Sequence, residues 1–141
     1  MSYTNECLIE IRQNEKGKAA YSRTRIYKGD VIGCFDGMAR AFELMVDGSV
    51  DYGPFNRSQA VEVACYNNSV IALVPDLDQP LSGVDFINHS CNPNCQLDGY
   101  ILVVAAEDIT PATELTINYQ AITLIPENKP CLCQIDCTFV L

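Results

Sequence analysis

The sequence predicts a mostly β fold of several short strands with few helices, and two observations support this fold class. Short apolar runs recur along the 141 residues and are separated by Gly, Pro, Asn and Asp, which favour turns. The stretch "QAVEVACYNNSVIALVP" (59–75) contains two such runs around Asn67–Asn68, as in a hairpin. Because hydrophobic residues make up 48% of the chain, it can bury a real core. We therefore expect a mostly β domain.

The first half of the chain predicts two strands and a helix. One strand is expected in "ECLIEIRQ" (6–13), followed by a charged turn. Another is expected in "YKGDVIGCF" (27–35), after the turn that Lys28, Gly29 and Asp30 form. In "MARAFELMVDG" (38–48) the large apolar residues fall at helical spacing and Asp-Gly closes the segment, which predicts a helix. These apolar residues are Met38, Phe42, Met45 and Val46.

The second half predicts strands only. After the 59–75 hairpin, "GYILVVAAEDI" (99–109) and "ELTINY" (114–119) each have the length and the apolar content of a strand. Pro111 marks the turn between them. The chain contains no internal repeat and no low-complexity tract.

The net charge of −9 comes entirely from the second half of the chain. Residues 1–57 carry eight basic and eight acidic side chains, whereas residues 58–141 carry one basic side chain, Lys129, and ten acidic ones. The absence of a basic patch argues against direct nucleic-acid binding. An acidic surface would attract a cationic partner, although solubility explains such a surface equally well.

The sequence also indicates where the protein acts. No apolar run approaches the roughly 20 residues that a membrane span needs. The start, "MSYTNECLIEIRQ", has no hydrophobic signal core. We therefore expect a cytoplasmic or nuclear protein that does not bind membranes, in which eight cysteines are unsuited to a disulfide framework.

Three of the cysteines form a cluster that favours metal binding. "CLCQIDC" (131–137) places Cys131, Cys133 and Cys137 within seven residues. Tetrahedral Zn²⁺ takes four thiolate or imidazole ligands, so a fourth ligand must come from elsewhere, and Cys91 or Cys95 would serve. Three unligated thiols remain the simpler alternative.

Two further residues stand out but specify no chemistry by themselves. His89 is the only histidine, no nucleophile motif accompanies it, and His-x-Cys is not a usual spacing for zinc ligands. It is therefore best interpreted as a hydrogen-bonded structural residue. Tyr119 ends a predicted strand, where packing in the core accounts for it equally well.

Taken together, four stretches resemble one family. "KGKAAYSRTRIYKGDVIGCFDG" (16–37) has a Gly-x-Gly-like turn followed by I-x-x-G-[DE]-x-[IV] and an aromatic-x-Gly. The stretch "FINHSCNPNC" (86–95), called the central motif below, matches [RH]-F-x-N-H-S-C-x-P-N except at its first position. The stretch "ELTINY" (114–119) matches E-L-T-[FYV]-[DA]-Y. With the cysteine-rich end, this order resembles the SET-domain protein-lysine methyltransferases, which use S-adenosylmethionine. The resemblance covers nearly the whole chain.

The resemblance implies a fold and a division of the chain. The expected fold is the SET-domain β-clip, made of several short sheets with a C-terminal pseudoknot and few short helices. Residues 1–125 would form the SET domain, and residues 126–141 would form a zinc-binding tail like the post-SET segment of many members. Cys91 would then be the fourth zinc ligand beside Cys131, Cys133 and Cys137.

The resemblance also implies roles for individual residues. S-adenosylmethionine would be held by the Gly-x-Gly-like turn, by the Asn-His pair of the central motif and by the C-terminal aromatic residues. These cofactor-binding residues are Gly17, Lys18, Ala19, Tyr21, Asn88, His89, Tyr119 and Phe139. The Tyr119 hydroxyl would also act in catalysis by positioning the amine and the methyl group. Phe35, Leu97 and Ile117 would wall the lysine channel.

The sequence departs from the family pattern at several positions. Ala19 and Ala112 stand where glycine is usual or common, Phe35 stands where tyrosine is usual, and Asp85 stands where arginine is common. The C-x-C-x3-C spacing of the tail is one residue shorter than usual. The apolar Leu97, Ile117 and Phe35 predict a product beyond monomethyllysine, because no phenol besides Tyr119 would restrain the amine.

Three functions agree with this sequence. The first is a protein-lysine methyltransferase that acts on a basic, histone-like tail. The second is an inactive SET-fold module that only docks a partner, and the third is a methyltransferase for a free amine or a small metabolite.

Overall fold

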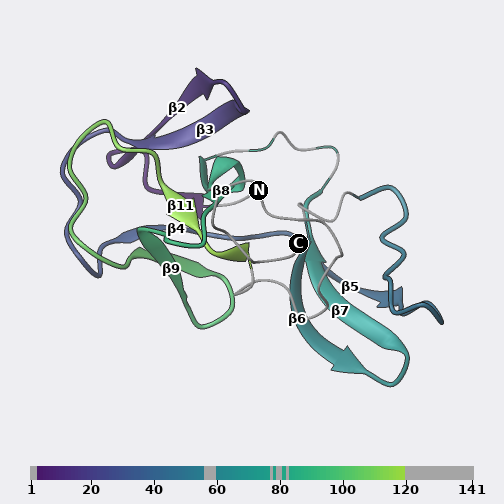
Figure 1. The fold of residues 1–141 in the computed structure, drawn as a ribbon. Helices are drawn as coiled ribbons and strands as arrows, with labels where there is room; N and C mark the ends of the chain where they lie inside the picture. Colours follow the sequence, from purple (N-terminus) through teal and green to yellow (C-terminus); the bar gives the residue numbers. More distant parts are fainter. Residues whose placement is uncertain (1–2, 56–59, 77, 79–80, 82, 120–141) are drawn as a thin grey trace.

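A computed structural model describes residues 3–55, 60–76, 78, 81 and 83–119 of the chain. These residues form short strands grouped in four small sheets, with one 3-10 helix of four residues (Figure 1). The elements are β1 Tyr3–Thr4, β2 Ile9–Asn14, β3 Gly17–Ser22, β4 Val31–Cys34, β5 Met38–Glu43, β6 Val61–Tyr66, β7 Ser69–Val74, η2 Gly83–Phe86, β8 Asn88–His89, β9 Cys95–Asp98, β10 Leu102–Ala105 and β11 Thr116–Ile117. The expected mostly β fold is confirmed.

The largest sheet has the strand order β1-β4-β10-β9, and all its pairs are antiparallel. Its central strands contribute Ile32, Val103 and Ala105 to the main core, where they are almost fully buried. The neighbouring segments add Ile26 and Leu115, which are both fully buried. Phe35 and Tyr119 pack against this core, which therefore helps to position both side chains.

The second sheet, β5-β7-β6, contains the predicted hairpin and corrects one prediction. β6 and β7 pair around Asn67, which has a φ of 54° as a tight turn requires, so the hairpin is confirmed. The helix predicted over 38–48 is wrong, because β5 is an edge strand that pairs with β7 along its whole length. Gly37 leads into β5 with a φ of 150°, and a Cβ there would lie 2.2 Å from the Val74 carbonyl oxygen.

Strand alternation explains how β5 packs. Phe42 packs edge-on against Tyr52 and Phe55, with ring centroids 5.0 and 6.1 Å away. Two residues earlier on the strand, the Arg40 guanidinium lies 5.8 Å from the Phe55 ring centroid. One face of β5 therefore covers a second, smaller core.

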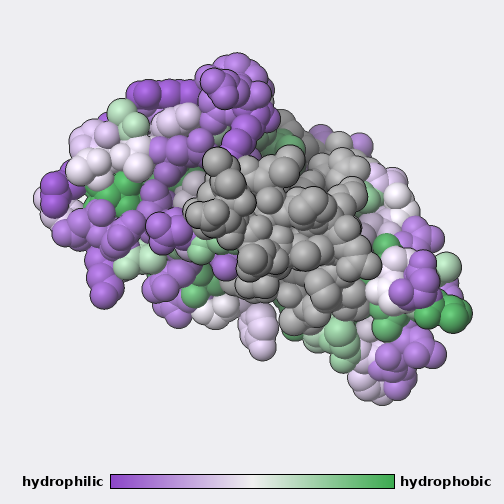
Figure 2. Space-filling model, in the orientation of Figure 1, coloured by the Kyte–Doolittle hydropathy of each residue, from purple (hydrophilic) through white to green (hydrophobic). Residues whose placement is uncertain are grey.

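Hydrophilic residues cover the β2–β3 end of the visible surface, whereas apolar residues gather at the outer end of β5 (Figure 2).

The third sheet is the β2–β3 hairpin, which is fastened to the segment before β11. Tyr21 forms a bridge with Glu114, and the Leu115 N–H donates to the Ala20 carbonyl at 2.8 Å. At the end of β3 the Ser22 hydroxyl, fully buried, donates to the Thr110 carbonyl at 2.7 Å. The hairpin thus packs against residues almost a hundred positions later in the sequence.

The fourth sheet is a parallel pair of two-residue strands, β8 and β11. Asn88 lies opposite Thr116 and His89 opposite Ile117, and the Ser90 N–H donates to the Ile117 carbonyl at 3.0 Å. This pair joins the central motif to the "ELTINY" segment. Among the described residues, no helix is long and apolar enough to cross a membrane. The proposed tail, 126–141, lies outside the described residues, so the expected domain boundary stays a prediction.

Candidate active site

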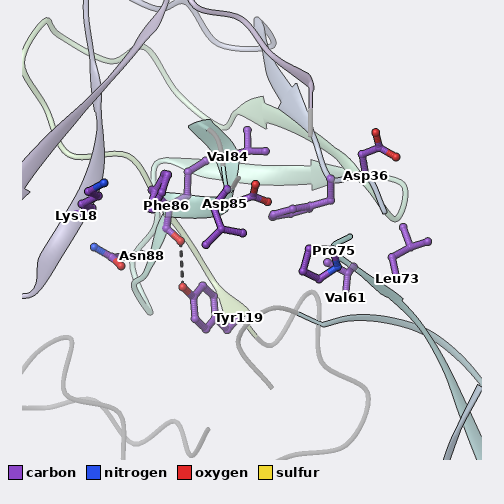
Figure 3. A pocket seen from close by; sticks show the side chains of 13 residues that line it. Lys18, Asp36, Val61, Leu73, Pro75, Val84, Asp85, Phe86, Asn88 and Tyr119 are labelled. Carbon is purple, nitrogen blue, oxygen red and sulfur yellow. Dashed lines mark hydrogen bonds between the residues drawn. The ribbon is translucent and has the colours of Figure 1, made fainter. Parts of the chain in front are cut away.

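A cavity of about 350 Å³ opens where the β2–β3 hairpin, η2, β8 and the β6–β7 hairpin meet (Figure 3). Its size lies within the range of small-molecule sites. Its wall combines apolar and aromatic side chains with one lysine, two aspartates and one asparagine. The lining residues are Lys18, Phe35, Asp36, Val61, Leu73, Pro75, Leu81, Val84, Asp85, Phe86, Ile87, Asn88 and Tyr119.

The Tyr119 hydroxyl is the fixed phenol of this cavity. It donates a hydrogen bond to the Ile87 carbonyl at 3.0 Å, as the dashed line in Figure 3 marks. Burial raises the pKa of Tyr119 to about 12, so the phenol stays protonated at neutral pH. A protonated phenol cannot act as a general base, but its oxygen can still accept a hydrogen bond from a neighbouring amine. The geometry therefore favours a positioning role.

His89 of β8 holds the backbone of Tyr119 through its imidazole ring. The Tyr119 backbone N–H donates to His89 Nδ1 at 3.0 Å, and the two rings lie 5.2 Å apart. Because Nδ1 accepts this bond, the proton of the neutral ring is on Nε2, which faces Cys91 Sγ at 3.3 Å. Burial lowers the pKa of His89, against an opposing hydrogen bond with the Ile117 backbone, so the ring is neutral at pH 7. His89 thus joins the central motif to the end of β11.

The Gly-x-Gly-like turn reaches the cavity through its middle residue. Gly17 starts β3 with a φ of 109°, and a Cβ there would meet no atom within 4 Å, so its conformation and not close packing requires glycine. Lys18 lines the cavity, and its Nζ lies 5.7 Å from the Phe86 ring centroid. Ala19 is fully buried opposite Arg12 in the hairpin. The Tyr21 hydroxyl accepts a hydrogen bond from the Asn14 side chain at 3.1 Å.

The structure places the three expected channel residues differently from one another. Phe35 lines the cavity beside Asp36, at the end of β4. Leu97 and Tyr119 are partly buried and pack against the main core, which includes the almost fully buried Ile117. Leu97 and Ile117 are not among the residues that line this cavity. Their role in a lysine channel stays a prediction.

The expected zinc ligands are only partly within the described residues. Cys91 is described, and its sulfur faces His89. Cys131, Cys133 and Cys137, together with Phe139, lie outside the described residues. In the part of the chain that the structure describes, no group of three or more His, Cys, Asp or Glu side chains is placed to hold a metal ion. Cys95, the alternative fourth ligand, is fully buried, and burial raises the pKa of its thiol to about 12.

The sequence patterns did not indicate several residues of the candidate site and its support. Val61, Leu73 and Pro75 line the cavity from the β6–β7 hairpin, which carries no motif. Asn94 belongs to the central motif, yet its spacing does not reveal that its side chain binds the β11 segment. Its amide donates to the Glu114 carbonyl at 2.9 Å, and its Oδ1 accepts from the Thr116 N–H at 2.9 Å.

Comparisons with known proteins agree with this geometry. A family model described as "SET domain" matches residues 3–120. The H3 lysine-36 specific histone-lysine N-methyltransferase of Aspergillus oryzae is 36% identical over 61 residues, which cover 38% of this chain and 6% of that protein. The solved structure of KRYPTONITE in complex with mCHH DNA, an H3(1-15) peptide and SAH superposes with a TM-score of 0.61 at 23% identity.

The matches differ in how much of each protein they cover. The superposition covers 94% of this chain and 29% of the KRYPTONITE chain, so it establishes the fold. The chain spans a small part of the length of both relatives. The family match, in contrast, covers most of the present chain, from the first strand to the end of the "ELTINY" segment. The chain therefore belongs to the SET-domain family.

Proposed function

We propose that this domain is an S-adenosylmethionine-dependent protein-lysine N-methyltransferase that acts on a basic, histone-like tail. The observation that carries the proposal is the cavity wall at Tyr119. A protonated phenol is fixed there by the Ile87 carbonyl, and its backbone is held by His89 of the central motif. An amine that enters this cavity would meet an oriented oxygen acceptor beside an apolar wall.

The described residues fit the proposed cofactor. The cavity has the volume of a small-molecule site, and it carries a cation at Lys18 and a side-chain amide at Asn88. Both residues belong to segments that the family uses to bind S-adenosylmethionine. When bound, S-adenosylmethionine supplies a methyl group on a positively charged sulfur, which makes that carbon electrophilic.

The residues of this chain would prepare the amine. A lysine amine has an ordinary pKa of about 10.4 and must lose its proton before it can attack. The apolar lining at Phe35, Val84 and Phe86 and the positive sulfur of the cofactor disfavour the charged ammonium, against the opposing effect of the carboxylates in the same wall. The Tyr119 oxygen would accept an N–H of the amine and aim its lone pair, and in-line displacement depends chiefly on such alignment.

Charge supports a basic substrate. Asp36 and Asp85 line the cavity, and all of the net charge of −9 comes from residues 58–141. The Aspergillus oryzae relative is named for lysine-36 of histone H3, and the KRYPTONITE structure contains an H3 peptide with SAH. We extend this substrate class, and a nuclear or cytoplasmic location, to the present chain. The absence of a basic patch in its sequence argues that it does not bind DNA directly.

The zinc-binding tail is part of the same proposal. Cys91 of the central motif would join Cys131, Cys133 and Cys137 around one Zn²⁺, as in a post-SET segment. The support is the chemistry of the ligand set, since four thiolates satisfy tetrahedral zinc. Phe139 would then lie over the adenine of the cofactor.

Calorimetric titration with S-adenosylmethionine tests the proposal first. The wild-type protein should bind one equivalent, and Tyr119→Phe should still bind but transfer methyl groups more slowly. Tyr100→Phe is the matched control, because Tyr100 is 68% exposed and is not among the residues that line the cavity. Absence of binding would identify an inactive docking module instead.

A substrate comparison then separates proteins from small amines. With a labelled methyl donor, label should enter an H3-tail peptide and not free lysine. Turnover should fall as added salt shortens the Debye length from about 10 Å to about 3 Å, because attraction to the acidic surface is screened. Preferential labelling of free amines, or turnover that is independent of salt, would contradict the proposed substrate.

A further inference from the structure

The Glu114 carboxylate lies between two segments that form neighbouring parts of the cavity wall. Its Oε1 accepts a hydrogen bond from Asn14 Nδ2 at 3.1 Å, and its Oε2 accepts one from Asn88 Nδ2 at 3.4 Å. Asn14 ends β2 and Asn88 starts β8, so one side chain joins the β2–β3 hairpin to the central motif. Lys18 of the hairpin and Asn88 both line the cavity, and Figure 3 shows them on the same side of it.

The surroundings of Asn14 fix which of its atoms faces Glu114. Its Oδ1 accepts the Lys16 backbone N–H at 2.8 Å, and its Nδ2 also donates to the Tyr21 hydroxyl at 3.1 Å. Reversing the amide would break the bond from the Lys16 N–H and place Oδ1 against the Glu114 carboxylate, whereas the Tyr21 hydroxyl can donate as well as accept. Asn14 and Asn88 therefore both present N–H donors to the position between them, and a carboxylate, which only accepts, is the side chain that satisfies both.

The backbone holds Glu114 in this position independently of its side chain. The bridge to Tyr21 and the bond from Asn94 Nδ2 to the Glu114 carbonyl attach the residue to the hairpin and to the motif. The carboxylate therefore has little freedom to move away from the two amides. Because the acceptor is charged, the two hydrogen bonds, at 3.1 and 3.4 Å, restrain the spacing of Asn14 and Asn88.

We propose that Glu114 is a positioning residue that sets the distance between Lys18 of the β2–β3 hairpin and Asn88 and thereby preorganises the cofactor cavity. The inference rests on the proposed function, because the quantity it controls is affinity for S-adenosylmethionine. Glu114 lies outside the residues that line the cavity, so its effect passes through Asn14 and Asn88.

A swap of donors and acceptors tests the bridge. Glu114→Gln turns one acceptor into a donor that faces the Asn14 amide, and Asn14→Asp places two carboxylates opposite each other. The double variant Asn14→Asp/Glu114→Gln restores the hydrogen-bonded bridge. The new amide at position 114 donates to the new carboxylate at position 14, and its oxygen still accepts from Asn88. Glu107→Gln is the control for loss of one negative charge, since Glu107 is exposed.

The readout is the dissociation constant for S-adenosylmethionine, measured by calorimetry well below each variant's melting temperature. Each single variant should raise this constant about tenfold or more, whereas the double variant should return to within about threefold of wild type. In turnover, the KM for S-adenosylmethionine should rise while kcat changes much less. Glu107→Gln should match wild type in all measurements.

Three results would overturn the inference, and the last differs in meaning from the first two. If the wild type binds S-adenosylmethionine and Glu114→Gln binds equally well, or if the losses of the two single variants multiply in the double variant, Glu114 is not a positioning residue. If the wild type does not bind S-adenosylmethionine, the proposed function fails and the positioning role fails with it. A variant that does not fold is replaced by Glu114→Ala with Asn14→Ala, whose effects on affinity should not add if the bridge exists.

Discussion

Replacing Asn94 by alanine should destabilise the fold, although Asn94 does not line the cavity. The Asn94 side chain closes a ring with β11, since its amide donates to the Glu114 carbonyl and its oxygen accepts from the Thr116 N–H. Both partners are backbone groups of half-buried residues. Alanine removes both bonds and offers these groups no replacement.

The magnitude follows from the two bonds. Each bond is worth about 0.5–1.5 kcal/mol, and a partner left unsatisfied away from water costs about 1–3 kcal/mol. With partial access of water to the half-buried groups, the free energy of unfolding should fall by about 2–4 kcal/mol. For a domain of this length, that loss corresponds to a decrease of roughly 7–14 °C in melting temperature.

Urea denaturation followed by circular dichroism measures this loss directly. Asn92→Ala is the matched control, because Asn92 is the neighbouring asparagine of the same motif and is exposed. Asn94→Asp keeps the acceptor for Thr116 but loses the donor, so it should show an intermediate loss. If Asn94→Ala cost under about 1 kcal/mol, as a surface change does, the ring of hydrogen bonds would not support the β8–β11 pair.

Four further results are expected. Ala112 is exposed and has a φ of 59°, so Ala112→Gly should raise the free energy of unfolding by about 0.5 kcal/mol, and a decrease in a urea titration would contradict this. Elemental analysis should find about one zinc per chain, and well under one would reject the ligand set of Cys91, Cys131, Cys133 and Cys137. Mass spectrometry at exhaustive turnover should show di- or trimethyllysine, and Ile117→Tyr should shift the product toward monomethyllysine; a wild-type reaction that halts at one methyl would show that another residue restrains the amine. Burial raises the pKa of Tyr119 to about 12, so its phenol stays protonated below that value. The methylation rate should therefore not fall between about pH 7 and 10, where the substrate amine loses its proton. A decline in this range would mean that Tyr119 ionises earlier.

Much of the fold could be predicted from local sequence because its strands are short and separated by turns. The Asn67–Asn68 hairpin and the strands on either side of Pro111 carry local signals of this kind. The helix predicted for residues 38–48 was wrong because Met38, Phe42 and Met45 match a helical period by coincidence. In the structure Met38 and Met45 are exposed, and pairing with β7 decides the conformation.

The candidate site was predictable only where a motif named it. The motifs brought attention to Asn88, His89 and Tyr119, and the structure joins these residues through the β8–β11 pair. No local pattern could reveal that Asn14 shares a carboxylate with Asn88, because Glu114 lies a hundred residues after Asn14. Such contacts depend on tertiary structure alone.

Methyl transfer to an H3-tail peptide tests the central claim most directly. The purified domain is incubated with S-adenosylmethionine and the peptide, and tandem mass spectrometry locates each added methyl group. The proposed activity predicts methyl groups on a lysine side chain, at a rate that Tyr119→Phe lowers and Tyr100→Phe leaves unchanged. A protein that binds S-adenosylmethionine yet places no methyl group on any lysine of the peptide would contradict it.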